Sequence, residues 1–221
     1  MANEPVQAYR LVNSKFPPLP LFEDVANADE FEALYELQAL TNPRLRAEAG
    51  DCSLVSLDEI PFGIHGCSYA MAPFTHVNPD GSRFSDGSFG VFYAADTLDT
   101  AVAEVQYHQE RYWRKVPALH YERFVFRSLA CTFKGESLLD GLAAPMDDPI
   151  YHPDDYTVSR NFGRQLKLER WEGLRYWSVR KPSAVCWALL TPRLLTAIIQ
   201  GLHLEMVWSE GITHVNQLAA L

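Results

Sequence analysis

The sequence predicts a single α+β domain in which a mixed central β-sheet is flanked by helices. The chain has 221 residues, of which 48% are hydrophobic, and this size and composition suit one domain with a sizeable core. Strand-like stretches at 6–12, 89–95 and 119–133 are separated by stretches with the helical period, such as 155–170. No internal repeat and no shift in composition marks a second domain, so we expect one domain over residues 1–221.

Charge and composition disfavour several classes of protein. The net charge of −9 argues against direct nucleic-acid binding, because contacts to phosphates need clustered cations. The start MANEPVQAYR lacks the pattern of a signal peptide, and no apolar run is long enough to cross a membrane. The four cysteines have neither C-x-x-C nor metal-ligand spacing. We therefore expect a reduced, cytoplasmic protein with no metal site and no membrane contact.

The first element is a short strand over residues 6–12. Arg10 lies inside it and either faces solvent by alternation or turns into a pocket. Any regular structure then ends at a group of prolines: Pro17, Pro18 and Pro20.

A helical insert is predicted at about 27–48. Residues 27–40 carry an apolar stripe near the helical period, and Asn27 or Asp29 can cap the helix. Three charged residues suggest a second short helix before Gly50: Arg44, Arg46 and Glu48. The insert is placed to form a cap over a pocket.

Residues 60–75 are apolar but contain two glycines and two prolines, which predicts a buried irregular segment that approaches the site. His65 and His76 lie in or beside this segment. Each is either a structural residue or a catalyst, and His76 is the closer of the two to Arg83 in sequence.

The stretch from Asn78 to His108 organises the rest of the chain. It begins with dense turn chemistry and continues into an apolar and aromatic run at 89–95, which suits a buried strand. A helix follows, for which four residues offer caps: Asp96, Thr97, Asp99 and Thr100. The turn, strand and helix place three polar groups in series: Arg83, Tyr93 and Glu104.

These polar groups suggest chemistry at an N-glycosidic bond. Glu104 and His108 are four residues apart and share one helix face, and a carboxylate among small apolar residues needs a partner or a task. Arg83 can hold a phosphate or carboxylate by two-pronged contacts, and Tyr93 can stack on a flat ring or donate a hydrogen bond. Glu104 can stabilise a developing cation. On spacing alone, the simpler alternative is a strand, a capped helix and a structural Arg–Glu ion pair.

The second half of the chain predicts further strands and helices. Residues 119–133 alternate as a strand does, and 155–170 reads as a helix capped by Asp155 or Thr157. In the polar link between them, His152 is either a metal ligand or part of a solvated loop. The remaining predicted elements are strands near 174–178 and 185–190, a short helix at 193–201 and a terminal strand from His203.

Several common active-site motifs are absent from the sequence. Ser178 has no G-x-S-x-G context, which disfavours a serine hydrolase. No G-x-G-x-x-G follows a strand and no G-x-x-x-x-G-K-[ST] is present, so neither a Rossmann nor a P-loop nucleotide site is supported.

Four other motifs are present: G-x-R-aromatic, G-x-x-Y-x-A, A-x-x-E followed by a histidine, and G-x-x-x-x-S-x-R. They lie at Gly81–Phe84, Gly90–Ala95, Ala101–His108 and Gly173–Arg180. Together they resemble the motifs of the RES domain, a family named after its arginine, glutamate and serine. The matching residues here are Arg83, Glu104 and Ser178, and the resemblance runs from about Tyr9 to about Trp208. The family more often has Trp-Asn after its arginine, where this chain has Phe84-Ser85.

The resemblance implies a fold similar to that of ADP-ribosyltransferase toxins, with NAD⁺ as the substrate. It implies that Arg83, Glu104 and Ser178 are catalytic. Arg83 is assigned to the pyrophosphate and Tyr93 to the nicotinamide or its ribose, while Glu104 would stabilise the cation and Ser178 would position the substrate. We expect His108 to orient Glu104. The residues expected to hold NAD⁺ are Arg10, Arg83, Tyr93, His108, Ser178 and Arg180.

The RES family also implies a biological role. Its members are toxins of bacterial toxin–antitoxin pairs that consume NAD⁺, so we expect cleavage of the nicotinamide–ribose bond by phosphorolysis or hydrolysis, with phosphate as a candidate co-substrate. The alternatives are an ADP-ribosyltransferase with a protein target and a non-catalytic nucleotide-binding protein. The implied partner is an Xre-like helix-turn-helix antitoxin that blocks the pocket, and a homodimer within the toxin–antitoxin complex is a further candidate assembly.

Overall fold

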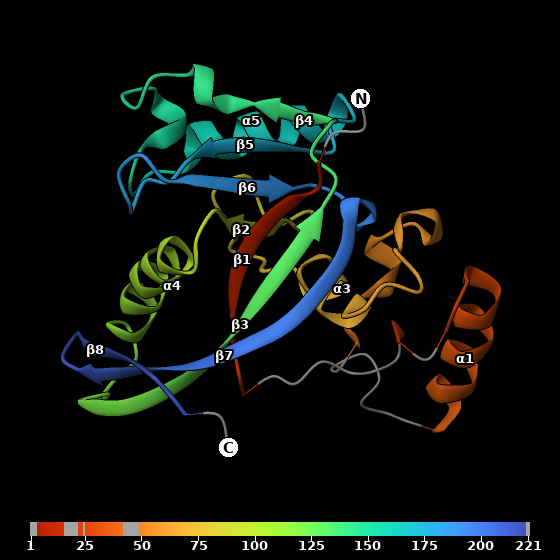
Figure 1. Cartoon of the computed structure of the whole chain (residues 1–221), viewed down its shortest axis with the longest axis horizontal. Coiled ribbons are helices and arrows are strands. Elements are labelled where there is room, and N and C mark those ends of the chain that lie inside the picture. The colour runs from red at the N-terminus through yellow and green to blue at the C-terminus, as the bar shows by residue number, and fades with distance from the viewer. Residues whose placement is uncertain (1–3, 16–21, 24, 42–48, 220–221) are drawn as a thin grey trace.

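One eight-stranded sheet forms the centre of the computed structural model, which describes residues 4–15, 22–23, 25–41 and 49–219 (Figure 1). The strand order is β4-β5-β6-β2-β1-β3-β7-β8. Neighbouring strands are antiparallel except β4 and β5, which are parallel. The strands are β1 (Val6–Asn13), β2 (Phe92–Ala95), β3 (Tyr121–Phe133), β4 (Leu138–Asp140), β5 (Gly173–Trp177), β6 (Val185–Leu189), β7 (Leu195–Ser209) and β8 (Ile212–Gln217).

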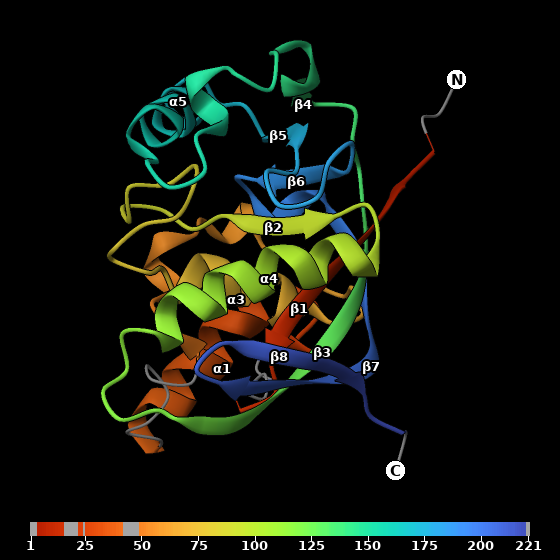
Figure 2. The ribbon, with the colours of Figure 1, turned by 90° about the vertical axis from the view of Figure 1, so that its left-hand side faces the viewer.

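Helices cover both faces of this sheet. The α-helices of the described residues are α1 (Ala28–Thr41), α3 (Cys67–Thr75), α4 (Leu98–Trp113) and α5 (Thr157–Leu168). Helix α4 lies on one face, with α3 and α1 on the other (Figure 2). Helix α5 lies beside the β4–β5 end of the sheet (Figure 1). The predicted α+β class with a mixed sheet flanked by helices is therefore confirmed.

Two hydrophobic clusters lie on opposite faces of the sheet. Met71 and Phe74 of α3 pack with residues such as Leu129 on one face. Ala101 of α4 packs with residues such as Phe126 on the other. Because strand side chains alternate between the two faces, the central strands supply both clusters, as Ala8 and Leu11 of β1 do.

Most of the predicted elements are present within a few residues of their expected bounds. The strand predicted at 6–12 is β1, which pairs with β3 in antiparallel register from Val6–Phe133 to Asn13–Phe126. The helix predicted at 155–170 is α5, and Asp155 accepts the N–H of Thr157 in its first turn at 2.9 Å.

Two predicted elements are wrong. Residues 193–201 do not form a helix, because after a short 3₁₀ turn at 192–194 the chain enters β7 and pairs with β3. Residues 60–75 are buried only in part, since Gly63 and His65 are exposed, and 67–75 form α3 in spite of Pro73. A helix that is apolar on nearly every side is buried between other elements, and this is the position of α3.

The helical insert is described only in part. Helix α1 confirms the helix at 27–40, and Phe31 packs on Phe22 and Phe62 in the α3-side cluster. This face of the sheet is opposite α4, so α1 does not cover the residues around Glu104. The second short helix falls on residues 42–48 and the three prolines on 16–21, and both lie outside the described residues. No helix within the described residues is both long and apolar enough to cross a membrane.

Candidate active site

Tyr93 fixes the loop that carries Arg83. Strand β2 turns the Tyr93 side chain toward the α4 side of the sheet, where its hydroxyl accepts the N–H of Phe84 at 2.9 Å. The same hydroxyl lies 2.8 Å from Oγ of Ser82. Ser82 and Phe84 flank Arg83, so one hydroxyl holds the Ser82 side chain and the Phe84 backbone on the two sides of the arginine. Burial raises the pKa of Tyr93 to about 12, and the phenol keeps its proton.

The guanidinium group of Arg83 is buried yet retains free donors. The residue is 7% exposed. Its Nη1 donates to the carbonyls of Ile150 at 3.1 Å and His152 at 3.0 Å, and its Cζ lies 4.5 Å from the centre of the Tyr156 ring. Among the described residues, Nε and Nη2 of Arg83 make no hydrogen bond, and neither atom is fully buried. These two atoms therefore reach solvent and can donate to an anion.

Helix α4 brings Glu104 to the end of β5. Thr97 caps this helix as predicted, and its side chain accepts the N–H of Thr100 at 3.2 Å. Oε1 of the partly buried Glu104 accepts a hydrogen bond from Oγ of Ser178 at 2.6 Å. Ser178 directly follows β5 and is 1% exposed. No ion pair joins Arg83 to Glu104 among the described residues, so the structural pair expected as the alternative is not formed.

The Ser178 hydroxyl is held from several directions. Its oxygen accepts the N–H groups of Arg180 at 3.2 Å and Lys181 at 3.0 Å, while its hydrogen points to Glu104. Both lone pairs and the proton are thus engaged, which suits a positioning group better than a nucleophile. Sγ of Cys186 lies 4.0 Å from the same Glu104 oxygen, and burial raises the pKa of this thiol, so it remains protonated.

Arg180 contacts two tyrosines. Its Nη2 donates to the carbonyl of Pro153 and, at 3.4 Å, to the Tyr156 hydroxyl. Its Cζ lies 3.2 Å from the centre of the Tyr107 ring. Since Tyr156 also packs on Arg83, one tyrosine contacts both guanidinium groups.

Helix α5 clamps the Arg83 loop in place. Arg160 donates from Nε to the carbonyl of Ser82 at 2.9 Å and from Nη2 to that of Asp80 at 2.7 Å. One turn later, the helix backbone passes so close to the loop that a Cβ on Gly163 would lie 1.9 Å from the carbonyl oxygen of Phe84. Only glycine allows this approach.

His108 packs on tyrosines and makes no hydrogen bond to Glu104 within the described residues. Its ring lies 5.3 Å from that of Tyr107 and 6.5 Å from that of Tyr156, centre to centre. Although the residue is exposed to solvent, desolvation by the surrounding protein and then the charges of nearby arginines lower the pKa of His108 to about 4. His108 therefore lies at the site as an uncharged ring, and the expected orientation of Glu104 by a direct bond is not seen.

Arg10 lies on the other face of the sheet. Its Cζ is 4.9 Å from the centre of the Phe92 ring, which belongs to the α3-side cluster, and its Nη1 donates to the carbonyl of Tyr93 at 2.8 Å. Burial lowers its pKa. The structure thus turns Arg10 inward, and separates it from Glu104 and Ser178.

Together, these contacts form a chain in which Glu104 binds Ser178, Ser178 accepts from the backbone of Arg180, and Tyr156 contacts both Arg180 and Arg83. The free N–H groups of Arg83 suit an anionic ligand, and the carboxylate of Glu104 suits a ligand that becomes positively charged. Oε2 of Glu104 makes no hydrogen bond among the described residues and is not fully buried, so it can accept a hydrogen bond from a ligand.

Residues 60–209 match the sequence profile of the RES domain, which is well over half of the chain. The chain belongs to the RES domain family. The matched segment contains Arg83, Glu104 and Ser178, the three residues that the motifs singled out. A relative, the uncharacterized protein y4oC of Sinorhizobium fredii, is 29% identical over 206 residues, which cover 91% of this chain and 82% of the relative.

A solved structure also aligns with this RES domain. The crystal structure of the M. tuberculosis MbcT–MbcA toxin–antitoxin complex matches 95% of this chain and 87% of the aligned chain. The TM-score is 0.47 and the sequence identity 10%, and so low a likeness carries no argument about function.

The sequence patterns did not single out Tyr107 and Tyr156, which contact Arg180 in the candidate site. Tyr107 precedes His108 on α4, and its hydroxyl contacts Asp154 and Arg111. Tyr156 falls in the first turn of the helix predicted at 155–170, and it directly precedes α5 in the structure; no local pattern distinguishes it as a site residue. His152 in the polar link before this helix is exposed, and its Nδ1 accepts backbone N–H groups. No cluster of His, Cys, Asp and Glu among the described residues could hold a metal ion.

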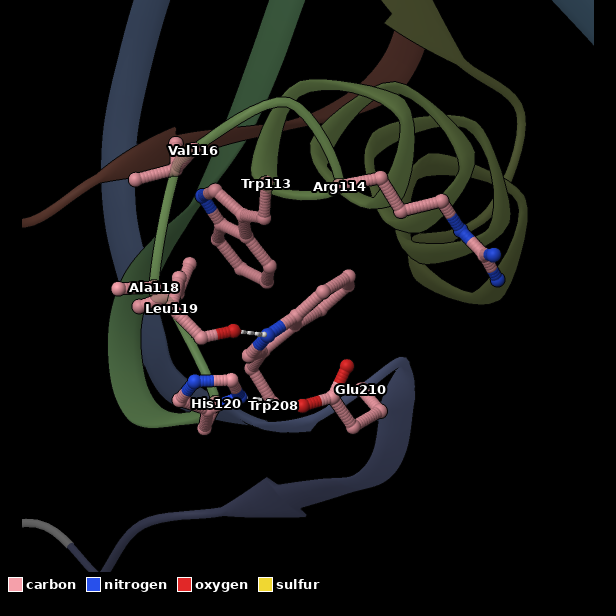
Figure 3. A pocket seen from close by; sticks show the side chains of 8 residues that line it. All are labelled: Trp113, Arg114, Val116, Ala118, Leu119, His120, Trp208 and Glu210. Carbon is pink, nitrogen blue, oxygen red and sulfur yellow. Dashed lines mark hydrogen bonds and ion pairs between the residues drawn. The ribbon is translucent and has the colours of Figure 1, made fainter.

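A hollow of about 350 Å³ lies elsewhere, at the C-terminal end of α4 (Figure 3). Trp113 and Trp208 form part of its wall, and His120 and Glu210 join across it by a 2.7 Å contact. None of the predicted site residues lines this hollow. It is therefore separate from the cluster around Glu104.

Proposed function

We propose that this RES domain is the toxin of a toxin–antitoxin pair and that it cleaves the nicotinamide–ribose bond of NAD⁺. The hydrogen bond of 2.6 Å between Ser178 and Glu104 carries the proposal, because it joins two residues of the family's namesake triad into one group. The free donors of Arg83, near the same cluster, support it.

The chemistry needs little acid catalysis, because nicotinamide leaves as a neutral molecule from a cationic ring. The C1′–N bond breaks and its electron pair stays with the nicotinamide nitrogen, which leaves an oxocarbenium-like ribose. An oxygen of water or phosphate then bonds to C1′, and water gives up a proton in the process. The site must therefore anchor the pyrophosphate, orient the ring and supply negative charge near the ribose.

Each of these tasks has a candidate residue. Oε2 of Glu104 would accept hydrogen bonds from the ribose hydroxyls and stabilise the cation, while Ser178 keeps Oε1 in place. Arg83 and Arg180 would hold the pyrophosphate, which two-pronged guanidinium contacts suit. Tyr93 would place the Arg83 loop and pack near the nicotinamide or its ribose. Arg10 is not needed in this arrangement, because it lies on the other face of the sheet.

The test is an incubation of the purified protein with NAD⁺, with and without phosphate, in which nicotinamide and the ribosyl product are followed. Loss that requires phosphate means phosphorolysis, and loss without phosphate means hydrolysis. Glu104→Gln is the matched inactive variant. A second incubation adds other proteins and NAD⁺ that carries a label on its ADP-ribose part. If NAD⁺ is consumed only in this mixture and the labelled group becomes attached to the added proteins, the activity is ADP-ribosyl transfer. NAD⁺ that stays intact under all conditions contradicts the proposal.

The proposal includes a partner, an Xre-like helix-turn-helix antitoxin that covers the cluster around Glu104. The support is family membership, because antitoxin control is what the RES resemblance implies. Co-expression with a candidate Xre-like helix-turn-helix protein should suppress NAD⁺ loss and give a stable complex, whose mass would also report whether the toxin pairs with a second copy. Full activity of the purified complex would contradict inhibition by a covered site.

A further inference from the structure

Tyr156 contacts most of the charged groups of the candidate site. It immediately precedes α5, and its carbonyl accepts the N–H of Arg160 at 2.8 Å, which fixes its backbone to the helix. Its ring centre lies 4.5 Å from Cζ of Arg83, and its hydroxyl accepts from Nη2 of Arg180 at 3.4 Å. No motif of the sequence assigned a role to this tyrosine.

The segment that leads to Tyr156 holds the same two arginines by its backbone. Arg83 donates to the carbonyls of Ile150 and His152, and Arg180 donates to that of Pro153. Each of these guanidinium groups is therefore fixed on one side by carbonyls and on another by the tyrosine. An arginine that is already ordered loses less side-chain entropy when it binds a ligand.

Both guanidinium groups keep donors for a ligand. Three nitrogen atoms make no hydrogen bond among the described residues, and none of them is fully buried: Nε and Nη2 of Arg83 and Nη1 of Arg180. Arg83, on the Tyr156 ring, offers the edge formed by Nε and Nη2, and Arg180, at the Tyr156 hydroxyl, offers Nη1. Two such cations beside one tyrosine suit a ligand with two linked anionic groups, because each phosphate can accept from one arginine.

We propose that Tyr156 is a positioning residue, which holds Arg83 and Arg180 in the geometry that binds the diphosphate of the substrate. The assignment of that diphosphate to NAD⁺ rests on the proposed function. The ring restrains the plane of Arg83 by a cation–π contact and the hydroxyl restrains Arg180. Without the ring, both side chains gain rotamers that the ligand must then remove.

The proposal predicts a change in binding and little change in the chemical step. Tyr156→Leu removes the ring and the hydroxyl, and should raise the Kd for ADP-ribose and the KM for NAD⁺ about tenfold, with kcat changed by less than about twofold. Tyr156→Phe keeps the ring and should raise both by about threefold. Tyr112→Leu is the matched control, because Tyr112 lies on α4 and is 64% exposed, and it should leave both constants unchanged.

The experiment combines calorimetric titration with ADP-ribose, NAD⁺ kinetics and thermal melting of each variant. A folded Tyr156→Leu protein with the wild-type Kd, or with a lowered kcat at unchanged KM, overturns the proposal. If Tyr156→Leu does not fold, Tyr156→Phe decides, and a wild-type Kd overturns it. If the wild type leaves NAD⁺ intact but binds ADP-ribose in a Tyr156-dependent way, the cleavage proposal fails and the positioning role stands. A wild type that does not bind ADP-ribose overturns the positioning role as well.

Discussion

Oγ of Ser178 donates to Oε1 of Glu104 across 2.6 Å, although 74 positions separate the two residues in sequence. The bond connects the loop after β5 to the middle of α4, two elements from different halves of the chain. The bond holds the carboxylate in one orientation, and Oε2 of Glu104, which has no hydrogen bond among the described residues and is not fully buried, remains able to accept one. The two backbone N–H groups on the Ser178 oxygen keep the hydroxyl itself from turning away.

Ser178→Ala should reduce NAD⁺ turnover by roughly 10- to 100-fold, because a hydrogen bond to a charged group is worth about 1.5–3 kcal/mol. It also leaves the N–H groups of Arg180 and Lys181 without their acceptor, so some stability is lost. Ser128→Ala is the matched control, since Ser128 is also buried and donates to the carbonyl of Leu202 far from the site. Equal loss of activity in both variants, measured at equal folded fraction, would mean that Ser178 acts only through stability.

Glu104→Gln should reduce turnover by roughly 10²–10³-fold while the fold is retained, because the amide oxygen still accepts from Ser178 but the negative charge is gone. The measurement is kcat for NAD⁺ consumption, together with the circular dichroism spectrum. Glu110→Gln removes a carboxylate of the same helix that pairs with Arg114 on the surface, and should be close to wild type. Undiminished turnover by folded Glu104→Gln would remove Glu104 from the mechanism.

Local signals predicted the elements that carry the site. The cap at Thr97 and the helical period after it are properties of neighbouring residues, and α4 begins where they indicate. The strand β3 was predicted from its alternation for the same reason. The resemblance to the RES motifs then singled out Arg83, Glu104 and Ser178. The spacing of these residues in sequence does not by itself indicate that they share one site.

Long-range packing decided what the sequence could not show. Ile198 and Ile199 belong to β7 because β3 pairs with them, and no local pattern records that pairing. Alternation could not place Arg10, because its strand supplies buried residues to both faces, Ala8 to one cluster and Leu11 to the other. Tyr156 reaches the site only because α5 packs on the Arg83 loop through Gly163, a contact between residues about 80 positions apart.

Arg83→Lys should raise the KM for NAD⁺ by about tenfold or more, because one ammonium group cannot both hold the carbonyls of Ile150 and His152 and donate a two-pronged contact to a phosphate. The change keeps the charge, so the experiment separates geometry from electrostatics. Arg175→Lys, at a surface pair with Asp140, is the matched control and should not alter KM. A KM for Arg83→Lys equal to that of the wild type would mean that charge alone suffices at this position.

Gly163→Ala should destabilise the protein by about 1–3 kcal/mol and raise the KM for NAD⁺, because the new Cβ would lie 1.9 Å from the carbonyl oxygen of Phe84 and must push α5 from the Arg83 loop. Urea unfolding and NAD⁺ kinetics measure the two effects. Gly211→Ala is the control, since its Cβ would meet only the end of the Glu110 side chain at 3.4 Å. Wild-type stability of Gly163→Ala would show that the helix and the loop can separate at no cost.

The lowered pKa of His108 predicts how stability depends on pH. In the unfolded chain the ring titrates near its ordinary value of 6.5, whereas in the folded protein desolvation and the nearby arginines lower the pKa to about 4. The unfolded state therefore binds the proton more tightly, so the contribution of neutral His108 is fully present above pH 6.5 and is lost as the pH falls from 6.5 toward 4. His108→Gln should make the unfolding free energy fall less steeply in this window, as measured by urea titration at several pH values.

A bound diphosphate should reverse part of that shift. Its negative charge would offset Arg180 and Arg83, the two arginines that contribute most to the lowered pKa after desolvation, so the pKa of His108 should rise toward its ordinary value. NMR titration of the histidine ring signals with and without ADP-ribose measures the change, and the signal that His108→Gln removes provides the assignment. A pKa for His108 that is the same in both titrations would mean that the ligand does not bind beside Arg83 and Arg180.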